Sequence, residues 1–270
     1  MSVITEKFSR LREKKQGALI PFLTLGYPSI DETCDLVMAM AEGGADLIEL
    51  GVPFSDPVAD GKTIQHCSQV ALKNGMTLNK GLELVSELRR RGLDIPLILM
   101  GYVNPFLAYG IEKLAADAKK AGVNGLIVPD LPPHEAELWK TAFSKEGIDI
   151  IFFLASTTSP ERMSRIVDSS SGFIYCLSVA GVTGAREALA SDLKGFLEKV
   201  KAITDKPLAV GFGLSKAEQI KEVIKMADGA IVASALLQGL ANCAKEERAS
   251  YLKNFVHGLK EATLGYTGTR

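Results

Sequence analysis

The sequence predicts an α/β protein, a single-domain (β/α)8 TIM barrel with an N-terminal amphipathic helix and extended loops after the second and sixth strands. Eight short apolar runs recur along the 270 residues, and amphipathic segments separate them. No Pro-, Gly- or Ser-rich linker and no shift in composition divides the chain. The length is close to the ~250 residues typical of this fold. We therefore expect one barrel domain over residues 1–270.

The eight apolar runs are the candidate strands. They are continuously rich in Ile, Leu and Val, whereas a sheet with one face in water would alternate apolar and polar residues. Such runs fit strands buried on both faces of a parallel sheet, and parallel strands need helical crossovers. The runs cover residues 18–26, 46–53, 95–102, 125–130, 149–156, 173–179, 207–213 and 229–233.

Helices are predicted between the runs, several of them starting at a Ser, Thr or Asp that can cap the first turn. They cover residues 31–42, 78–91, 110–121, 135–145, 160–168, 191–203, 215–226 and 246–262. An additional amphipathic helix is predicted within residues 1–16, where Ile4, Phe8 and Leu11 recur at helical spacing. The alternative architecture is a doubly wound open sheet. That fold would favour a G-x-G-x-x-G turn after its first strand, where residues 25–28 read LGYP.

Composition and charge exclude several classes of protein. The 31 basic and 32 acidic side chains leave a net charge of -1, and no dense basic run extends beyond residues 89–91, so we expect no nucleic acid partner. The longest stretches without a charged residue are 17 residues and are broken by Gly or Pro, which predicts no membrane span. The first residues lack the apolar core of a signal peptide, and the four cysteines show no metal-ligand spacing. A cytoplasmic protein with free thiols is predicted.

Glu49 is the first candidate catalytic residue. It stands inside the apolar run DLIELG at residues 46–51, where an unpaired charge costs several kcal/mol to bury. Glu49 therefore has either a dedicated partner or a raised pKa, and both states suit an acid or a base. The alternative is a carboxylate that points outward between strands and binds neighbouring backbone.

The loop at residues 52–61 follows this strand and supplies a second carboxylate. It holds two prolines, Asp56, Asp60 and Gly61, and it is longer than the 2–6 residues usual for such connections. Either aspartate could simply form an Asx-turn. Together with Glu49, however, a loop aspartate makes a pair in which one group gives a proton and the other takes one.

A phosphate site is predicted after the last strands. Gly211 and Gly213 lie at the end of the seventh strand, Ser215 and Glu218 form a potential capping box, and Ser234 opens a short helix after the eighth strand. Helix N-termini bind anions, and the loops after strands seven and eight are the common phosphate position of this fold.

The loop after the sixth strand, residues 178–186, is rich in small residues and fits a mobile lid. An exposed linker without function is the alternative. In a closed lid, Gly184 could donate its N–H to the phosphate and Thr183 could bond a loop carboxylate.

Two other chemistries lack their residues. None of the eight runs contains the lysine that imine chemistry requires. The three histidines, His66, His134 and His257, are too dispersed to predict a metal site. Tyr102 and Tyr175 at strand ends could line an aromatic pocket or could be ordinary packing.

Four motifs carry a family resemblance: PFLTLG at residues 21–26, ELGVPFSDPVADG at 49–61, AGVTG at 180–184 and GFG at 211–213. With them, the chain resembles the α subunit family of tryptophan synthase over essentially its full length. The resemblance implies cleavage of indole-3-glycerol phosphate to indole and glyceraldehyde 3-phosphate, with no metal or organic cofactor in this chain. It also implies an α2β2 heterotetramer in which a pyridoxal phosphate-containing β subunit receives indole through a tunnel.

The resemblance also assigns residues. Glu49 would protonate indole carbon 3 and relay the side-chain hydroxyl proton, and Asp60 would take up or stabilise the ring N–H proton. The residues that would line the indole pocket are Phe22, Met100, Tyr102, Ile127, Phe153, Tyr175 and Phe212. The residues that would hold phosphate are Gly184, Gly213 and Ser234. Thr183 would contact the loop aspartate from the lid. The β-facing surface would include Asp56, Pro57, Asn104, Pro132 and Gly181.

Two positions depart from the family. Ala233 stands where many relatives have glycine, and it would be strained if the position requires a positive φ. Pro129 replaces a smaller residue and could alter the rim of the indole pocket. Two other functions remain open: another phosphate-binding barrel of amino-acid synthesis, which would typically use strand lysines, and a catalytically silent subunit that only activates a β partner.

Overall fold

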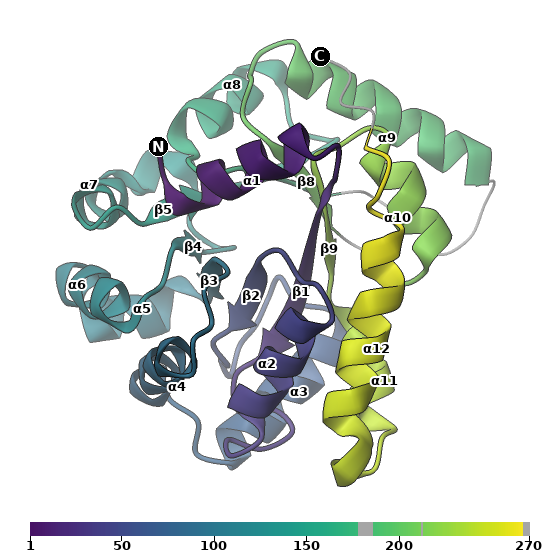
Figure 1. Cartoon of the computed structure of the whole chain (residues 1–270). Coiled ribbons are helices and arrows are strands. Elements are labelled where there is room, and N and C mark those ends of the chain that lie inside the picture. Colours follow the sequence, from purple (N-terminus) through teal and green to yellow (C-terminus); the bar gives the residue numbers. More distant parts are fainter. Residues whose placement is uncertain (178–185, 212, 267–270) are drawn as a thin grey trace.

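The structure is a computed structural model that describes residues 1–177, 186–211 and 213–266, with the backbone alone for residues 186–191. Within these ranges, nine parallel strands form a nearly closed barrel with helices around it (Figure 1). The predicted TIM barrel is confirmed. None of the described helices combines the length and apolar character that spanning a membrane would require.

The strands follow the apolar runs, with one break. Their bounds are β1 Ala18–Thr24, β2 Ile48–Gly51, β3 Leu97–Met100, β4 Gly125–Ile127, β5 Asp149–Ile151, β6 Phe153–Ala155, β7 Ile174–Leu177, β8 Leu208–Gly211 and β9 Gly229–Val232. They are ordered β5-β4-β3-β2-β1-β9-β8-β7-β6. The predicted strand at residues 149–156 is therefore two strands separated by Phe152. The N–H of Tyr175 donates to the Phe152 carbonyl at 3.2 Å, which links this interruption to β7.

The helices cover the outside of the barrel. Their bounds are α1 Val3–Glu13, α2 Thr33–Glu42, α3 Lys62–Lys73, α4 Leu78–Arg90, α5 Val103–Tyr109, α6 Ile111–Ala121, α7 Glu137–Lys145, α8 Pro160–Ser169, α9 Arg186–Lys201, α10 Ala217–Ile224, α11 Ser234–Ala241 and α12 Arg248–Glu261, with 3-10 turns at Pro133–Glu135 and Lys245–Glu247. Helices α3 and α5 were not predicted. Helix α3 buries only Cys67, Ser68 and Ala71, and α5 is seven residues long and contains Pro105, so neither has a wide apolar stripe.

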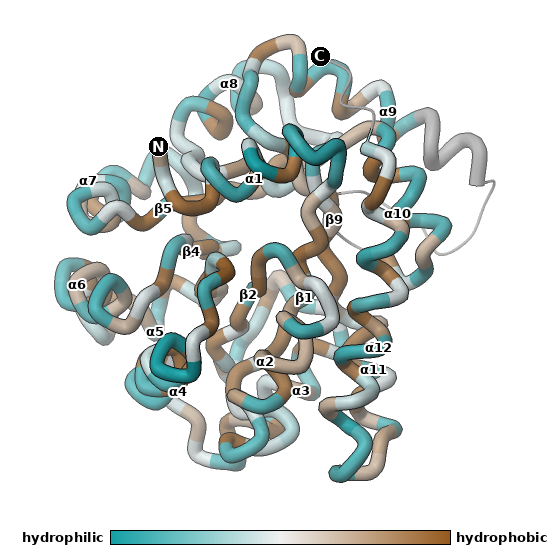
Figure 2. Tube along the Cα trace, viewed as in Figure 1, coloured by the Kyte–Doolittle hydropathy of each residue, from teal (hydrophilic) through white to brown (hydrophobic). Residues whose placement is uncertain are grey.

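Helix α1 closes the amino-terminal end of the barrel (Figure 1). Its apolar residues Ile4, Phe8 and Leu11 join a buried cluster with inward-facing strand residues such as Ile20. The rings of Phe8 and Phe173 lie 5.6 Å apart. Figure 2 shows that apolar residues concentrate along the strands and that polar residues are frequent on the surrounding helices. The carboxyl-terminal end is thus the end where a site can be open.

Two buried carboxylates at the amino-terminal end, Asp46 and Asp228, have cationic partners. Asp46, just before β2, accepts hydrogen bonds from a backbone N–H of β1 at 2.9 Å and from Lys260 at 2.7 Å. Asp228, just before β9, accepts from the first N–H of β8 at 2.8 Å and from Arg12 at 2.9 Å. Tyr266 also donates to Asp228, at 2.6 Å. The two carboxylates accept hydrogen bonds from backbone N–H groups of β1 and β8, and Lys260 and Arg12 balance their charges. Asp46 and Asp228 therefore have structural roles.

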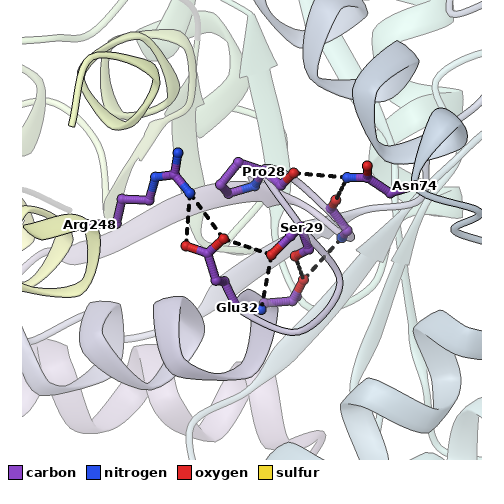
Figure 3. A network of polar contacts seen from close by, with 7 residues as sticks. Pro28, Ser29, Glu32, Asn74 and Arg248 are labelled. Atoms are coloured by element: carbon purple, nitrogen blue, oxygen red, sulfur yellow. Dashed lines mark hydrogen bonds and ion pairs between the residues drawn. The ribbon is translucent and has the colours of Figure 1, made fainter. Parts of the chain in front are cut away.

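A polar network braces the loop after β1 (Figure 3). Arg248 donates to both carboxylate oxygens of Glu32, at 2.9 and 3.0 Å, and Ser29 donates at 2.7 Å. Asn74 donates to the carbonyl of Pro28 at 2.8 Å. Burial raises the pKa of Glu32, but the hydrogen bonds from Ser29 and Arg248 outweigh it, and the net pKa is below the ordinary value. The loop is therefore fixed between α3 and α12.

Candidate active site

Strand β2 directs Glu49 into the barrel. Leu47 belongs to the inner cluster, whereas Ile48 and Leu50 pack in the outer core between sheet and helices. Because side chains alternate along a strand, Glu49 shares the inward face with Leu47. Its side chain is buried at 1% exposure, and its Oε2 atom has no hydrogen-bond partner among the described residues. This placement does not support the outward-facing alternative.

The surroundings of Glu49 favour its protonated form. Burial raises its pKa to about 8, and the negative charge of Asp60 adds to the shift. Among the described residues, no basic side chain contributes to the pKa of Glu49. Near neutral pH the group is therefore mostly a carboxylic acid that can donate a proton.

The loop after β2 places Asp60 near Glu49. The N–H of Asp60 donates to the carbonyl of Pro57 at 3.0 Å, and Gln65 on α3 donates to the Asp60 carbonyl at 2.8 Å. Burial raises the pKa of Asp60 to about 6, against a lowering effect of the Tyr102 hydroxyl. Near pH 7 Asp60 is therefore mostly ionised while Glu49 is mostly protonated. Asp56 in the same loop is exposed.

Aromatic and apolar side chains surround the pair. Phe153 and Tyr175 meet edge to face with ring centroids 4.5 Å apart. Burial raises the pKa of Tyr175, and the charges of Glu49 and Asp60 raise it further, so this ring lies close to both carboxyl groups. Of the predicted indole-pocket residues, Phe22, Tyr102, Ile127 and Tyr175 are buried and Met100 and Phe153 are partly buried. Phe212 lies outside the described residues.

The described part of the predicted phosphate site lies after β8 and β9, which are neighbours in the sheet. Gly213 is exposed with φ +76°, a conformation that favours glycine. Ser234 is the first residue of α11, and Ala233 before it has φ -124°, so alanine is not strained by a positive φ. Thr183 and Gly184 lie outside the described residues.

The capping box predicted from Ser215 and Glu218 is wrong. Gln219, one position further, accepts from the N–H groups of Ser215 at 2.9 Å and Lys216 at 3.0 Å. Helix α10 therefore begins at Ala217, two residues later than predicted. Glu218 and Gln219 are both side chains that can accept such hydrogen bonds, so the sequence alone does not show which of them does. The choice depends on the residue at which the helix begins.

Pro129 lies beside the candidate site, in a pocket of about 250 Å³. Residues 128–133 after β4 line it together with Phe152, Phe153, Arg162 and Ile166. Since Phe153 also belongs to the predicted indole pocket, the unusual proline stands next to its wall. In the part of the chain that the structure describes, no three His, Cys, Asp or Glu side chains form a group that could hold a metal ion.

Sequence reasoning missed Ala59 and Gln65. The N–H of Ala59 donates to the Tyr102 hydroxyl at 3.1 Å, and Gln65 donates to the Asp60 backbone. Both contacts are made by the backbone of the loop, so the residue types along the sequence carry no signal for them.

Comparisons with known proteins agree on one family. The family model described as "Tryptophan synthase alpha chain" matches residues 8–263. The tryptophan synthase alpha chain of Roseiflexus castenholzii is 50% identical over 260 residues, 96% of this chain and 100% of the relative. The solved subunit alpha from Legionella pneumophila has a TM-score of 0.90 and 32% identity, covering 97% of this chain and 98% of that one. A solved tryptophan synthase from M. tuberculosis has a TM-score of 0.87 and 34% identity, covering 97% and 100%. The chain belongs to the tryptophan synthase alpha chain family.

Proposed function

We propose that Glu49 and Asp60 carry the reaction of this family in this chain. The family cleaves indole-3-glycerol phosphate to indole and glyceraldehyde 3-phosphate, a carbon-carbon lyase step of tryptophan biosynthesis. The observation that carries the assignment is the position of Glu49, which is 1% exposed, has no hydrogen-bond partner for Oε2 among the described residues and lies near Asp60. Burial raises the pKa of Glu49 to about 8 and that of Asp60 to about 6. At neutral pH this pair holds one acid and one base, which the reaction needs.

The first step makes the indole ring an electron sink. Protonated Glu49 gives its proton to carbon 3 of the ring, and positive character develops at the ring nitrogen. The carboxylate of Asp60 accepts the N–H hydrogen bond and stabilises this charge, or takes up the proton. Both effects are stronger in the transition state than in the ground state, so they lower the barrier.

The second step breaks the carbon-carbon bond. Glu49, now a carboxylate, takes the proton of the hydroxyl group on the side-chain carbon next to the ring. That carbon becomes the aldehyde of glyceraldehyde 3-phosphate, and the electron pair of the broken bond restores the aromatic ring. Glu49 is protonated again at the end, and any proton taken up by Asp60 returns to the nitrogen.

The remaining predicted residues would bind the substrate. The aromatic and apolar side chains around the carboxyl pair fit the flat indole ring. Gly213 and Ser234, at the carboxyl ends of neighbouring strands, fit the phosphate, because unpaired N–H groups and the helix dipole of α11 favour an anion there. We propose that Gly184 adds a phosphate contact, that Phe212 completes the indole pocket and that Thr183 contacts Asp60.

The family implies a β subunit partner. We propose an α2β2 complex in which the β subunit holds pyridoxal phosphate and receives indole, while this chain needs no cofactor. The contact surface would include Asp56, Pro57, Asn104, Pro132 and Gly181. Val58 supports this placement, because an apolar side chain 81% exposed beside Asp56 and Pro57 suits a covered surface. We propose that binding of the β subunit orders this loop and thereby raises turnover. Equal turnover of the isolated chain and the complex would contradict this.

We also propose that residues 1–270 form one domain, because strands from both halves of the sequence share one barrel. The proposed compartment is the cytoplasm. All four cysteines are free thiols, which fits a reducing compartment.

The test is indole release by Glu49→Gln. Removing the acid should lower kcat by about 10²–10⁴-fold while substrate still binds, as measured by single-turnover assays and ligand titration. Glu42→Gln is the matched control, since Glu42 pairs with Lys253 on the surface of α2. A wild-type rate in Glu49→Gln would refute the assignment, and a silent subunit would release no indole even when unmodified.

A further inference from the structure

Tyr102 contacts the loop that carries Asp60. It follows β3, caps the start of α5 and is only 3% exposed. Its hydroxyl oxygen accepts a hydrogen bond from the N–H of Ala59 at 3.1 Å, and its ring lies 5.4 Å from that of Phe54, centroid to centroid. One side chain just after β3 therefore holds the loop after β2 at two separate points.

The same hydroxyl group has a second role. A tyrosine hydroxyl has one proton to donate and two lone pairs to accept with. Accepting from Ala59 leaves the proton free, and the carboxylate of Asp60 is next along the chain. Burial raises the pKa of Tyr102 above its ordinary range, and Asp60 raises it further, so the hydroxyl keeps its proton as a donor. The interaction in turn lowers the pKa of Asp60.

The surroundings of Asp60 make this donor important. Glu49 from β2 and Tyr175 from β7 also lie near Asp60, and neither supplies positive charge. Asp130 adds negative charge near Tyr102. Among the described residues, the Tyr102 hydroxyl is the one group that lowers the pKa of Asp60. Gln65 holds the Asp60 carbonyl from the other side, at 2.8 Å, but does not act on the carboxylate.

We propose that Tyr102 is a positioning residue for Asp60: its hydroxyl group fixes the loop at Ala59, and its ring packs on Phe54, so that the neighbouring Asp60 carboxylate is directed at the ring nitrogen of the substrate. This role goes beyond lining the indole pocket, and it rests on the proposed function of Asp60. A ring that only lined the pocket would act through its carbon atoms, and phenylalanine would replace it without loss.

The test is Tyr102→Phe in the full chain, assayed for indole release alone and with a β subunit. The variant keeps the ring beside Phe54 and loses only the hydroxyl. We expect kcat to fall roughly 10-fold, because the loop loses its hydrogen bond at Ala59, while KM changes by less than about threefold. The acidic limb of the kcat/KM profile should move to higher pH by about one unit, because Asp60 holds its proton more tightly.

Tyr109→Phe is the matched control. Tyr109 ends the same helix α5, and its hydroxyl donates to Asp117 at 2.6 Å on the outside of the barrel. This variant should keep the wild-type rate and pH profile. Urea unfolding of both variants checks that a loss of rate is not a loss of fold.

A double-mutant cycle with Asp60→Asn separates this inference from the proposed function. If Tyr102 acts through Asp60, Tyr102→Phe should cost little further activity once Asp60 is gone. Wild-type activity of Asp60→Asn would overturn the proposed function itself. An impaired Asp60→Asn beside a Tyr102→Phe variant with normal kcat, or with an unmoved acidic limb, would overturn the role of Tyr102 alone.

Discussion

Asp46 and Asp228 at the amino-terminal end of the barrel and Glu49 inside it are all buried carboxyl groups, but they differ in their partners. At the amino-terminal end, Asp228 receives hydrogen bonds from Arg12, Tyr266 and a strand N–H, and Asp46 is bonded by Lys260. At the carboxyl-terminal end, Glu49 is equally buried, but no basic side chain among the described residues contributes to its pKa. The same chemical group therefore serves stability in Asp46 and Asp228, and we propose that it serves proton transfer in Glu49.

The difference shows what makes a buried carboxyl group reactive. Burial alone disfavours the charged form, and a nearby cation or N–H donor reverses the effect. Glu32 illustrates the reversal at the edge of the catalytic end, since Arg248 and Ser29 lower its pKa despite burial. An unpaired group costs stability that the rest of the fold must supply, and such groups cluster at functional sites.

The largest expected effect lies at the amino-terminal end. Asp228→Asn removes the charge partner of Arg12 inside the protein, and losing one member of a buried pair typically costs about 3–5 kcal/mol. Urea unfolding should show this loss, while kcat of the folded fraction stays within about twofold. A variant as stable as the unmodified chain would remove the basis of the comparison.

The next effect has the opposite sign. Burial raises the pKa of Glu49 to about 8 in the folded chain, whereas its ordinary pKa is 4.5. Between these two pH values the folded chain keeps the Glu49 proton and the unfolded chain has lost it. Stability from this group is full below pH 4.5 and falls as the pH rises toward 8. Glutamine at this position cannot ionise. At pH 8.5 the free energy of unfolding of Glu49→Gln should therefore be roughly 2–4 kcal/mol higher than that of the unmodified chain. Equal stabilities at pH 5 and pH 8.5 in the unmodified chain would contradict the raised pKa.

A smaller effect is the pH dependence of turnover. The proposed mechanism needs Asp60 ionised and Glu49 protonated, so kcat/KM should be highest between the pKa values of about 6 and about 8. It should fall about tenfold for each pH unit beyond either limit. A profile that rises steadily through pH 9 would show that Glu49 starts the reaction as a base.

The smallest effect belongs to the surface. Glu42 on α2 pairs with Lys253 at 2.9 Å, and both side chains are more than half exposed. Such pairs contribute about 0–1 kcal/mol, so Glu42→Ala should barely move the urea midpoint. If Glu42→Ala lost as much free energy of unfolding as Asp228→Asn, solvent exposure would not explain the difference between the surface pair and the buried pair.

Much of the fold follows from the pattern of apolar residues. The strands were predicted because each is buried on both faces, and the first helix because Ile4, Phe8 and Leu11 share one stripe. The division of the fifth predicted strand into β5 and β6 was not predicted, because Phe152 is as apolar as its neighbours. The two strands differ only in their backbone pairing, β5 with β4 and β6 with β7. Helix α3 was missed because it buries only small side chains.

The candidate site was predictable where a residue conflicts with its local pattern. Glu49 is a charge within an apolar strand, and Asp60 lies in a loop too long and stiff for a simple connection. The hydrogen bond from Ala59 to Tyr102 joins residues 43 positions apart through a backbone N–H. Every residue except proline has this N–H, so the residue types do not predict the bond. The roles of Thr183, Gly184 and Phe212 remain predictions from the resemblance.

The position of α1 affects how substrate and product can enter and leave the barrel. Because Ile4, Phe8 and Leu11 fill the amino-terminal end of the barrel in the described part of the chain, we expect small molecules to reach the proposed site from the carboxyl-terminal end. A released indole molecule would have to leave past the same loops that admitted its precursor. Any protein seated over that end would intercept the product before bulk water could dilute it.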